Sequence, residues 1–365
     1  MRILHAADLH LSSAEADYGF SVLDEVLSLA APASPGAESV LLLSGDVFDS
    51  WADLADLYCR FRAAVEAAPP GLSVLVAAGN HDLLGASGDP ARYDFGPRVT
   101  WAWKEALVVQ RDEAEFILLP YGALLPDAAS LPPARKTRII AAHGAMPEMN
   151  WLGPAEEGGT KTRANLDATA LVALSPDYTA LGHIHDWARQ EIEGVPFAYP
   201  GSARVWRRGE AGQRAAQRLD LQARGKKSPE RVGLKSAGQY RLLEAALAED
   251  GSLDEAGLRK LVSGSSPGDW LDIRLSGLAQ REEPLSRQEA ALKAGILKGF
   301  RKVEISHDEV VFLGEEASSE AAAAFRRAWE GMLPALTEKY GAAAARKALE
   351  IGLRKVEGAR AGASS

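Results

Sequence analysis

The sequence predicts a layered α/β fold, followed by a smaller α/β unit and C-terminal helices. Two observations carry this prediction. Short apolar runs alternate with amphipathic stretches of helical period, which is the strand–helix–strand order of layered α/β proteins. The composition then shifts at residues 223–229, a stretch rich in glycine, lysine, serine and proline. A domain boundary is expected there.

Five apolar runs of strand length mark the core of the first part. They are rich in valine, isoleucine and leucine, as in strands buried on both faces, and they span residues 3–7, 40–43, 72–76, 138–142 and 178–181. Helices are expected over residues 20–29 and 51–67, where apolar residues recur on one helical face. Runs at 106–109 and 116–119 indicate strands of a second sheet, and those at 195–199 and 217–221 closing strands.

Each of the five runs leads into residues that can bind a metal. The motifs are, in order, Asp8-Leu9-His10, Gly45-Asp46, Gly79-Asn80-His81-Asp82, His143-Gly144 and Gly182-His183-Ile184-His185. In layered α/β proteins, functional groups gather beyond the carboxyl ends of the strands. Five of the seven histidines fall in these motifs, which scattered surface histidines would not do. We therefore expect these side chains at one edge of the sheets.

The expected metal ligands combine imidazole nitrogens with carboxylate and amide oxygens, and they include no thiolate. They are Asp8, His10, Asp46, Asn80, His143, His183 and His185. This mixture suits octahedral hard or borderline ions, manganese first and magnesium or iron as alternatives. Asp46 sits in the tightest Gly-Asp turn, at the middle of the ligand series. Since each oxygen of a carboxylate can take one metal, Asp46 is expected to bridge two divalent ions.

Paired ions can hydrolyse phosphoric esters, because they hold the phosphate and lower the pKa of a water between them. The leaving group then needs a proton. His81, next to Asn80, is the expected donor, with Asp82 orienting it. A role for His81 in supporting a ligand remains the alternative. Asp49 is expected to cap the following helix, for which Ser50 is the other candidate, and to support Asp46 rather than to bind a metal.

The five motifs together resemble the calcineurin-like metallophosphoesterases. Asp-x-His, Gly-Asp-x-x-Asp, Gly-Asn-His-Asp, a lone His-Gly and Gly-His-x-His occur in the order and spacing of that superfamily, over residues 1–220. The resemblance implies a layered β-sandwich flanked by helices. The two ligand sets that it implies share Asp46 and are completed by Asp8, His10 and His185 for one ion and by Asn80, His143 and His183 for the other.

A finer resemblance is to the SbcD-type DNA double-strand-break-repair nucleases, whose bacterial members pair with an SbcC-type coiled-coil ATPase. It rests on the motifs Asp8-Leu9-His10-Leu11, Gly45-Asp46-Val47-Phe48-Asp49 and Tyr199-Pro200-Gly201-Ser202. Ser12 stands where that family often has glycine. The resemblance implies exo- or endonuclease activity on DNA. It also implies a nuclease domain over 1–225, an α/β capping domain over 230–312 and a helical partner-binding segment over 319–357. The composition of the last residues, 358–365, predicts a disordered tail.

A basic and aromatic stretch, Arg204-Val205-Trp206-Arg207-Arg208, follows the Gly-Ser turn. Arg204, Arg207 and Arg208 could track a DNA backbone, and Trp206 could stack on a base. An exposed turn with one anchoring tryptophan is an equal alternative. Lys161 and Arg163, in the long irregular insertion at 145–165, make a weaker candidate of the same kind.

Composition narrows the remaining alternatives. A single cysteine, Cys59, excludes an internal disulfide framework, and no apolar run reaches membrane-spanning length. With no signal peptide at the start, we expect a cytoplasmic protein.

The net charge of −9 weighs against tight metal-free DNA binding. It favours the alternative of a stand-alone phosphoesterase for small molecules such as cyclic nucleotides. A scaffold that lost its activity is disfavoured by the complete ligand set, and homodimerisation stays open.

Overall fold

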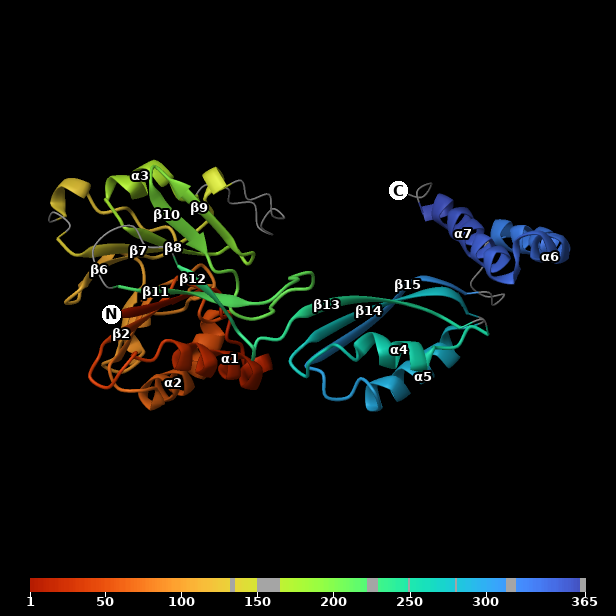
Figure 1. The fold of residues 1–365 in the computed structure, drawn as a ribbon, viewed down its shortest axis with the longest axis horizontal. Coiled ribbons are helices and arrows are strands. Elements are labelled where there is room, and N and C mark those ends of the chain that lie inside the picture. The colour runs from red at the N-terminus through yellow and green to blue at the C-terminus, as the bar shows by residue number, and fades with distance from the viewer. Residues whose placement is uncertain are drawn as a thin grey trace. The chain divides into compact units, whose positions relative to one another are not determined.

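The structure, a computed structural model, describes residues 1–131, 135–149, 165–221, 229–248, 250–279, 281–312 and 320–361. It divides into two compact units, Met1–Gln239 and Tyr240–Ser365 (Figure 1). Most of the predicted insertion at 145–165, with Lys161 and Arg163, lies outside the described residues.

Two six-stranded sheets form the first unit. The first has the order β12-β11-β1-β2-β3-β4 and contains β1 (Arg2–Ala6), β2 (Ser39–Leu43), β3 (Leu72–Ala77), β4 (Val99–Ala102), β11 (Ala215–Asp220) and β12 (Glu230–Gly233). The second has the order β5-β6-β7-β8-β10-β9 and contains β5 (Leu107–Gln110), β6 (Ala114–Leu119), β7 (Thr137–His143), β8 (Tyr178–Gly182), β9 (Ala188–Ile192) and β10 (Val195–Tyr199). Strands β1 to β4 are parallel, as are β6, β7, β8 and β10.

Helices cover both outer faces of this sandwich. The helices α1 (Ala16–Leu29) and α2 (Trp51–Ala67) share a core with the first sheet, and α3 (Ala168–Ala173) shares one with the second. Figure 1 shows α3 on the opposite side of the sandwich from α1 and α2. Four short 3-10 turns complete the described part of this unit, at Ser13–Glu15, Pro90–Arg92, Ala128–Ser130 and Pro147–Met149. The layered sandwich that the sequence predicts is thereby confirmed.

Strand β2 shows why the predicted runs are apolar throughout. Leu41 and Leu43 pack in the core beneath α1 and α2. Val40 and Leu42, which point the other way, pack in the core between the two sheets. Because both faces of the strand are buried, every position must be apolar, and no polar alternation remains.

The second unit is a three-stranded parallel sheet with two crossover helices. It contains β13 (Tyr240–Ala246), α4 (Glu255–Val262), β14 (Trp270–Ala279), α5 (Glu282–Ala294) and β15 (Lys302–Phe312), with β14 in the middle of the sheet. Leu258 of α4 and Leu285 of α5 pack in one core with Ile273 of β14. Both helices therefore cover the same face of the sheet, as Figure 1 shows.

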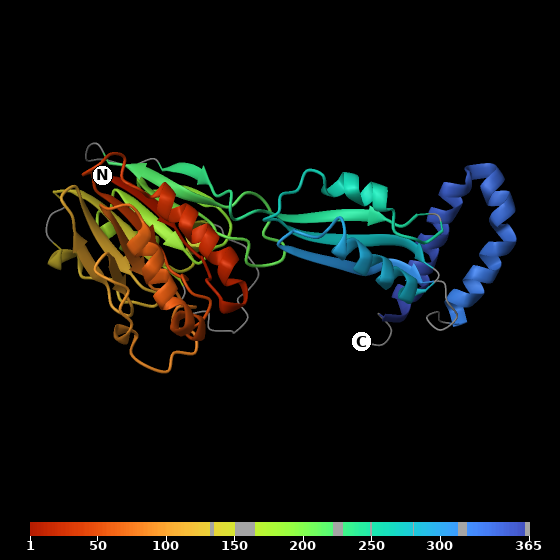
Figure 2. The same cartoon turned by 90° about the horizontal axis from the view of Figure 1, so that it is seen from below.

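Two C-terminal helices, α6 (Glu320–Tyr340) and α7 (Ala342–Ala361), form a hairpin that Figure 2 shows side by side. Gly341 joins them in a left-handed conformation, with φ +84°, and so separates the two helices. Gly352 of α7 faces the ring of Phe325 in α6, where a Cβ atom would come within 2.3 Å. Leu353 of α7 packs in turn on the sheet beside Val311.

The structure differs from the expected boundaries in two places. Strand β12 pairs with β11 in the first sheet, and Leu234 and Ala237 lie in its core, so residues 230–239 belong with the first unit and not with the second. The boundary expected at 223–229 therefore falls between β11 and β12 of one sheet. In addition, α7 continues to Ala361, so residues 358–361 are helical rather than a disordered tail; residues 362–365 lie outside the description.

None of the helices in the described ranges is both long and apolar enough to span a membrane.

His5 is buried between the sheets, with none of its surface exposed. Its ring nitrogen Nδ1 accepts a hydrogen bond from the Tyr178 hydroxyl at 2.9 Å, and Nε2 donates to the Leu181 carbonyl at 3.2 Å. Burial lowers the pKa of His5 to about 3. The ring is therefore neutral in the folded chain at any pH near neutrality.

This burial predicts a loss of stability in acid. The unfolded chain protonates His5 near pH 6.5 and the folded chain only near pH 3, so its contribution is complete above pH 6.5 and is lost between the two values. One proton corresponds to a slope of about 1.4 kcal/mol per pH unit. Urea unfolding with a chelator, from pH 7 to 4.5, should show a shallower fall in unfolding free energy for His5→Gln. Equal slopes in both proteins would contradict the prediction.

Candidate metal centre

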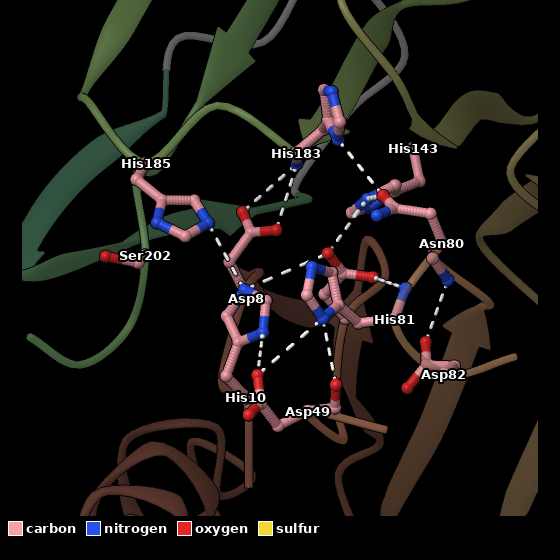
Figure 3. Close-up of polar contacts among 12 residues, drawn as sticks. Asp8, His10, Asp49, Asn80, His81, Asp82, His143, His183, His185 and Ser202 are labelled. Carbon is pink, nitrogen blue, oxygen red and sulfur yellow. Dashed lines mark hydrogen bonds and ion pairs between the residues drawn. The ribbon is translucent and has the colours of Figure 1, made fainter. Parts of the chain in front are cut away.

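The seven predicted ligands meet where strands of both sheets end, and Figure 3 labels all of them except Asp46. They are Asp8 and His10 after β1, Asp46 after β2, Asn80 after β3, His143 at the end of β7, and His183 and His185 after β8. The two sheets are joined here by direct contacts. The His183 backbone N–H donates to both carboxylate oxygens of Asp8, at 3.0 and 3.1 Å.

Asp46 lies between the two groups of histidines. Its Oδ2 atom is 3.3 Å from His143 Nε2 and 3.8 Å from His10 Nε2. Its Oδ1 atom accepts a hydrogen bond from the His81 backbone N–H at 2.8 Å. One buried carboxylate therefore faces a ring from each predicted ligand set, which is the position a bridging ligand requires.

The predicted ligands fall into two sets around Asp46. Asp8, His10 and His185 offer ligand atoms within 4.8 Å of one another, and so do Asp46, His143 and His183. Asn80 adds its amide oxygen to the second set, 3.0 Å from His143 Nε2 and 3.2 Å from His183 Nδ1. These are the two sets that the sequence resemblance implies. The assignment of each residue as a ligand stays a prediction.

Hydrogen bonds behind the rings decide which nitrogen faces the centre. The Nδ1 atoms of His10, His143 and His185 meet oxygens on the far side: Asp49 Oδ1 at 3.1 Å, the Ser44 carbonyl at 2.8 Å and Glu210 Oε1 at 2.5 Å. In the neutral rings these acceptors hold the proton on Nδ1, so each Nε2 presents an electron pair inward. This is the tautomer that binds a metal.

The spacing of His10 and His185 indicates whether a cation fits between the predicted ligands. Their Nε2 atoms are 3.2 Å apart. Two electron pairs at that separation repel each other unless a proton or a cation lies near both. Carboxylate and amide oxygens complete the surroundings, and the resulting donor set fits divalent ions that prefer nitrogen and oxygen ligands.

The charges of the buried groups are strongly coupled. Burial lowers the pKa of His10 to about 4 and that of His183 to about 3, so both rings are neutral and able to bind a cation. Burial also disfavours a charged His143, but the Asp46 carboxylate outweighs it and raises the pKa of His143 to about 9. The same histidine holds the pKa of Asp46 below its ordinary value, against the effect of burial. A bound cation would replace the proton that this pair shares.

Glycines allow the strand ends, within the first sheet and between the two sheets, to approach this closely. A Cβ atom on Gly182 would lie 1.8 Å from the Ser44 carbonyl oxygen, and one on Gly79 would lie 2.0 Å from Asp46 Oδ1. Asp8, His10 and Asp46 themselves have positive φ angles, of 54°, 43° and 51°. Such conformations cost about 1 kcal/mol or more each in residues other than glycine. The surrounding fold therefore holds these side chains against local strain.

Asp49 lies beside His81, the predicted proton donor. Nδ1 of His81 donates to the Asp49 carbonyl oxygen at 2.8 Å and lies 3.6 Å from its carboxylate. The same carboxylate accepts from His10 (Figure 3). Of the two candidate caps of α2, Ser50 and not Asp49 fills the position, by accepting from the Asp53 backbone N–H at 3.2 Å. Asp49 thus supports a predicted ligand, but that ligand is His10 and not Asp46.

The orienting role predicted for Asp82 is wrong. Its two carboxylate oxygens accept hydrogen bonds from the backbone N–H groups of Phe48, at 2.9 Å, and Gly79, at 2.7 Å. The side chain is fully buried. Asp82 therefore fastens the loop after β3 to the loop after β2. It turns inward because it satisfies two buried backbone donors that would otherwise lack partners.

The basic stretch after β10 is only partly at the surface. Arg204 is one of the possible DNA contacts in this stretch, but it is 1% exposed and lies 3.4 Å from Glu15, so this part of the interpretation is wrong. Trp206 is partly buried, and its ring stacks on His10 with centroids 3.9 Å apart. Arg207 and Arg208 are exposed. DNA contact by these two arginines and by Trp206 stays a prediction.

Sequence reasoning missed Glu210, which accepts the proton of His185 Nδ1. It also missed the stacking of Trp206 on His10. Both residues lie far from their partners along the chain and belong to no recurring motif. No signal in the sequence pointed to these contacts.

The sequence and the structure were then compared with known proteins. The family described as calcineurin-like phosphoesterase matches residues 1–187. No curated protein matches the chain. The members of the matching family use divalent metals to hydrolyse phosphoric esters, in agreement with the donor sets described above.

Solved structures that resemble this chain share little sequence with it. An archaeal phosphodiesterase is 14% identical, covering 64% of this chain and 100% of its own, with a TM-score of 0.34. The phosphopantetheinyl hydrolase PptH from Mycobacterium tuberculosis is 15% identical over 55% and 89%, with a TM-score of 0.37. Vacuolar protein sorting 29 from Cryptosporidium parvum is 18% identical over 64% and 96%, with a TM-score of 0.33. The family match covers 187 of the 365 residues, more than half of the sequence, and the chain belongs to the calcineurin-like phosphoesterase family.

Proposed function

We propose that this protein is a two-metal phosphodiesterase that acts on DNA, in end processing and double-strand-break repair, together with an SbcC-type coiled-coil ATPase. The observation that carries the hydrolytic part is the pair of donor sets on either side of Asp46. Divalent ions held there, manganese being the expected metal, would supply a binding site for phosphate, an activated water and stabilisation of the developing charge.

The protein's own residues would then act in separate roles. Asp8, His10 and His185 form one ion site, and Asn80, His143 and His183 form the other, with Asp46 between them. His81 would protonate the leaving oxygen from Nε2, because its Nδ1 proton is engaged by the Asp49 carbonyl. The Asp49 carboxylate lies 3.6 Å from the same Nδ1 atom, so both contacts keep this face of the ring turned away from the leaving oxygen.

Three features favour DNA over a small molecule. The first is the sequence resemblance of the motifs around residues 8–11, 45–49 and 199–202. The second is the presence of a further unit, Tyr240–Ser365, outside the matched segment. The third is the pair of exposed cations Arg207 and Arg208, adjoining Trp206 at the centre. The net charge of −9 supports the alternative, a stand-alone phosphoesterase for small molecules such as cyclic nucleotides.

The helical hairpin is the proposed docking site for the ATPase. Four large apolar side chains are exposed on it: Met332, Leu333, Tyr340 and Ile351. Exposed apolar groups gathered on one element favour a covering partner. A second copy of this chain is the alternative occupant.

The substrate class is tested by incubating the purified chain and manganese with linear duplex DNA, single-stranded DNA and cyclic nucleotides. The proposal expects cleavage of DNA and no turnover of cyclic nucleotides. Turnover of cyclic nucleotides with intact DNA would favour the small-molecule alternative.

Replacing Asp46 or His143 with alanine should abolish manganese-dependent hydrolysis of bis-p-nitrophenyl phosphate. Each change removes a donor from the centre, so the loss should exceed the about 10–100-fold that outer partners of a metal ligand contribute. Asp17→Ala, which removes an exposed carboxylate, is the matched control. Undiminished turnover in the Asp46 variant would refute the metal assignment.

His81→Ala should retain both ions and lose activity according to the leaving group. A protein acid contributes about 10²–10⁴-fold to a step that needs a proton. Cleavage of DNA, whose leaving alkoxide needs one, should slow to that extent. Hydrolysis of bis-p-nitrophenyl phosphate, whose nitrophenolate leaves unaided, should fall much less. Loss of bound metal in the variant would identify His81 as a ligand instead.

Partner binding is tested in the full chain by the double change Met332→Glu and Leu333→Glu. Two charges at exposed apolar positions of α6 should abolish co-purification with the ATPase and leave bis-p-nitrophenyl phosphate hydrolysis unchanged. Leu261→Glu, at an exposed leucine of α4, is the control. A complex that survives the double change would place the interface elsewhere.

A further inference from the structure

The two predicted ion sites are held in different ways. In the site with Asn80, the ring of His143 donates to a main-chain carbonyl at the end of β2, that of Ser44. In the other site, both histidines contact residues of 204–214, which we call the buttress segment. This segment follows β10 and lies beyond the matched family segment, which ends at residue 187.

Trp206 is the first contact of the buttress segment. Its ring lies parallel to that of His10, with centroids 3.9 Å apart and an interplanar angle of 4°. Its edge meets the ring of His185, with centroids 5.2 Å apart. The guanidinium of Arg207 lies 4.1 Å from the centroid of the Trp206 ring. The His10 imidazole therefore cannot turn away from the centre without losing this stack.

Glu210 is the second contact. Its Oε1 atom accepts from Nδ1 of His185 at 2.5 Å, and its Oε2 atom accepts from the Trp206 backbone N–H at 2.7 Å. The residue is 8% exposed. One carboxylate therefore fixes the orientation of the His185 ring and the position of the tryptophan that holds His10.

Arg214 is the third contact, and it joins the end of the buttress segment to the main chain of His185. This buried side chain donates to the His185 carbonyl at 3.2 Å, to the Ser202 hydroxyl at 3.1 Å and to the Ala211 carbonyl at 2.6 Å. The main chain of a predicted ligand is thus tied to the same short segment that orients its ring.

We propose that Trp206 and Glu210 are positioning residues that hold His10 and His185 for one ion, and that the buttress segment sets the affinity of this site separately from the site at Asn80, His143 and His183. The inference rests on the proposed two-ion centre. Partners that orient metal-binding histidines typically contribute about 10–100-fold to metal affinity. The segment is therefore a means of tuning one ion without altering the ligands of the other.

The test is a titration of Mn²⁺ into the metal-free full-length chain, followed by calorimetry and by the electron paramagnetic resonance signal of free Mn²⁺. The wild type should bind two ions. Trp206→Ala and Glu210→Ala should each weaken one of them by about 10-fold or more and leave the other unchanged. Trp206→Phe should restore the affinity, since phenylalanine can stack on His10, whereas Trp206→Leu should not.

A matched control is Trp103→Ala, which removes a partly buried tryptophan stacked on Trp101 in the same unit. It should leave both affinities unchanged. In the milder Glu210→Gln, kcat for bis-p-nitrophenyl phosphate should recover at saturating Mn²⁺, which a general loss of structure would not allow.

The inference would be overturned if the variants weakened the affinity for both ions equally or for neither. It would also be overturned if Trp206→Leu restored the affinity as completely as Trp206→Phe. A wild-type chain that binds fewer than two ions would instead refute the two-ion centre, and this inference with it.

Discussion

The whole centre depends on one electrostatic constraint: electron pairs from two sheets face one another around the Asp46 carboxylate. Hydrogen bonds at the rear of His10, His143 and His185 turn each Nε2 inward. This leaves two of these nitrogens 3.2 Å apart beside buried carboxylates. Such a cluster is stable only when protons or cations lie within it. The backbone is strained at Asp8, His10 and Asp46, where φ is positive. This strain holds the side chains in an arrangement that is stable only with positive charge nearby.

The sandwich makes this arrangement possible because parallel strands of both sheets end at the same place. Glycines at the strand ends remove the side chains that would keep the sheets apart; a Cβ atom on Gly182 would overlap the carbonyl of Ser44. Carboxylates then tie the loops together. Asp82 joins the loops after β2 and β3, and Asp8 accepts the backbone N–H of His183 across the two sheets. Rigidity at the centre thus comes from residues that need not touch a substrate.

A second group of residues that positions the predicted ligands lies outside the strand ends. The buttress segment reaches the centre after β10 and contacts His10 and His185 through the side chains of Trp206 and Glu210. The matched family segment contains the predicted ligands, and a later stretch of chain holds two of them in place. In this way a hydrolytic centre shared by many proteins can acquire different metal affinities without any change of ligand.

The sequence by itself determined the layered fold and the presence of a second unit, and it predicted the seven ligands, because apolar runs that lead into a glycine or a polar side chain are patterns of neighbouring residues. Only the tertiary structure decided that Arg204 is buried, that Asp82 turns from His81 to two backbone donors, that β12 completes the first sheet, and that Glu210 and Trp206 hold His185 and His10. These contacts join residues distant along the chain. They depend on how strands and loops pack, which no local periodicity encodes.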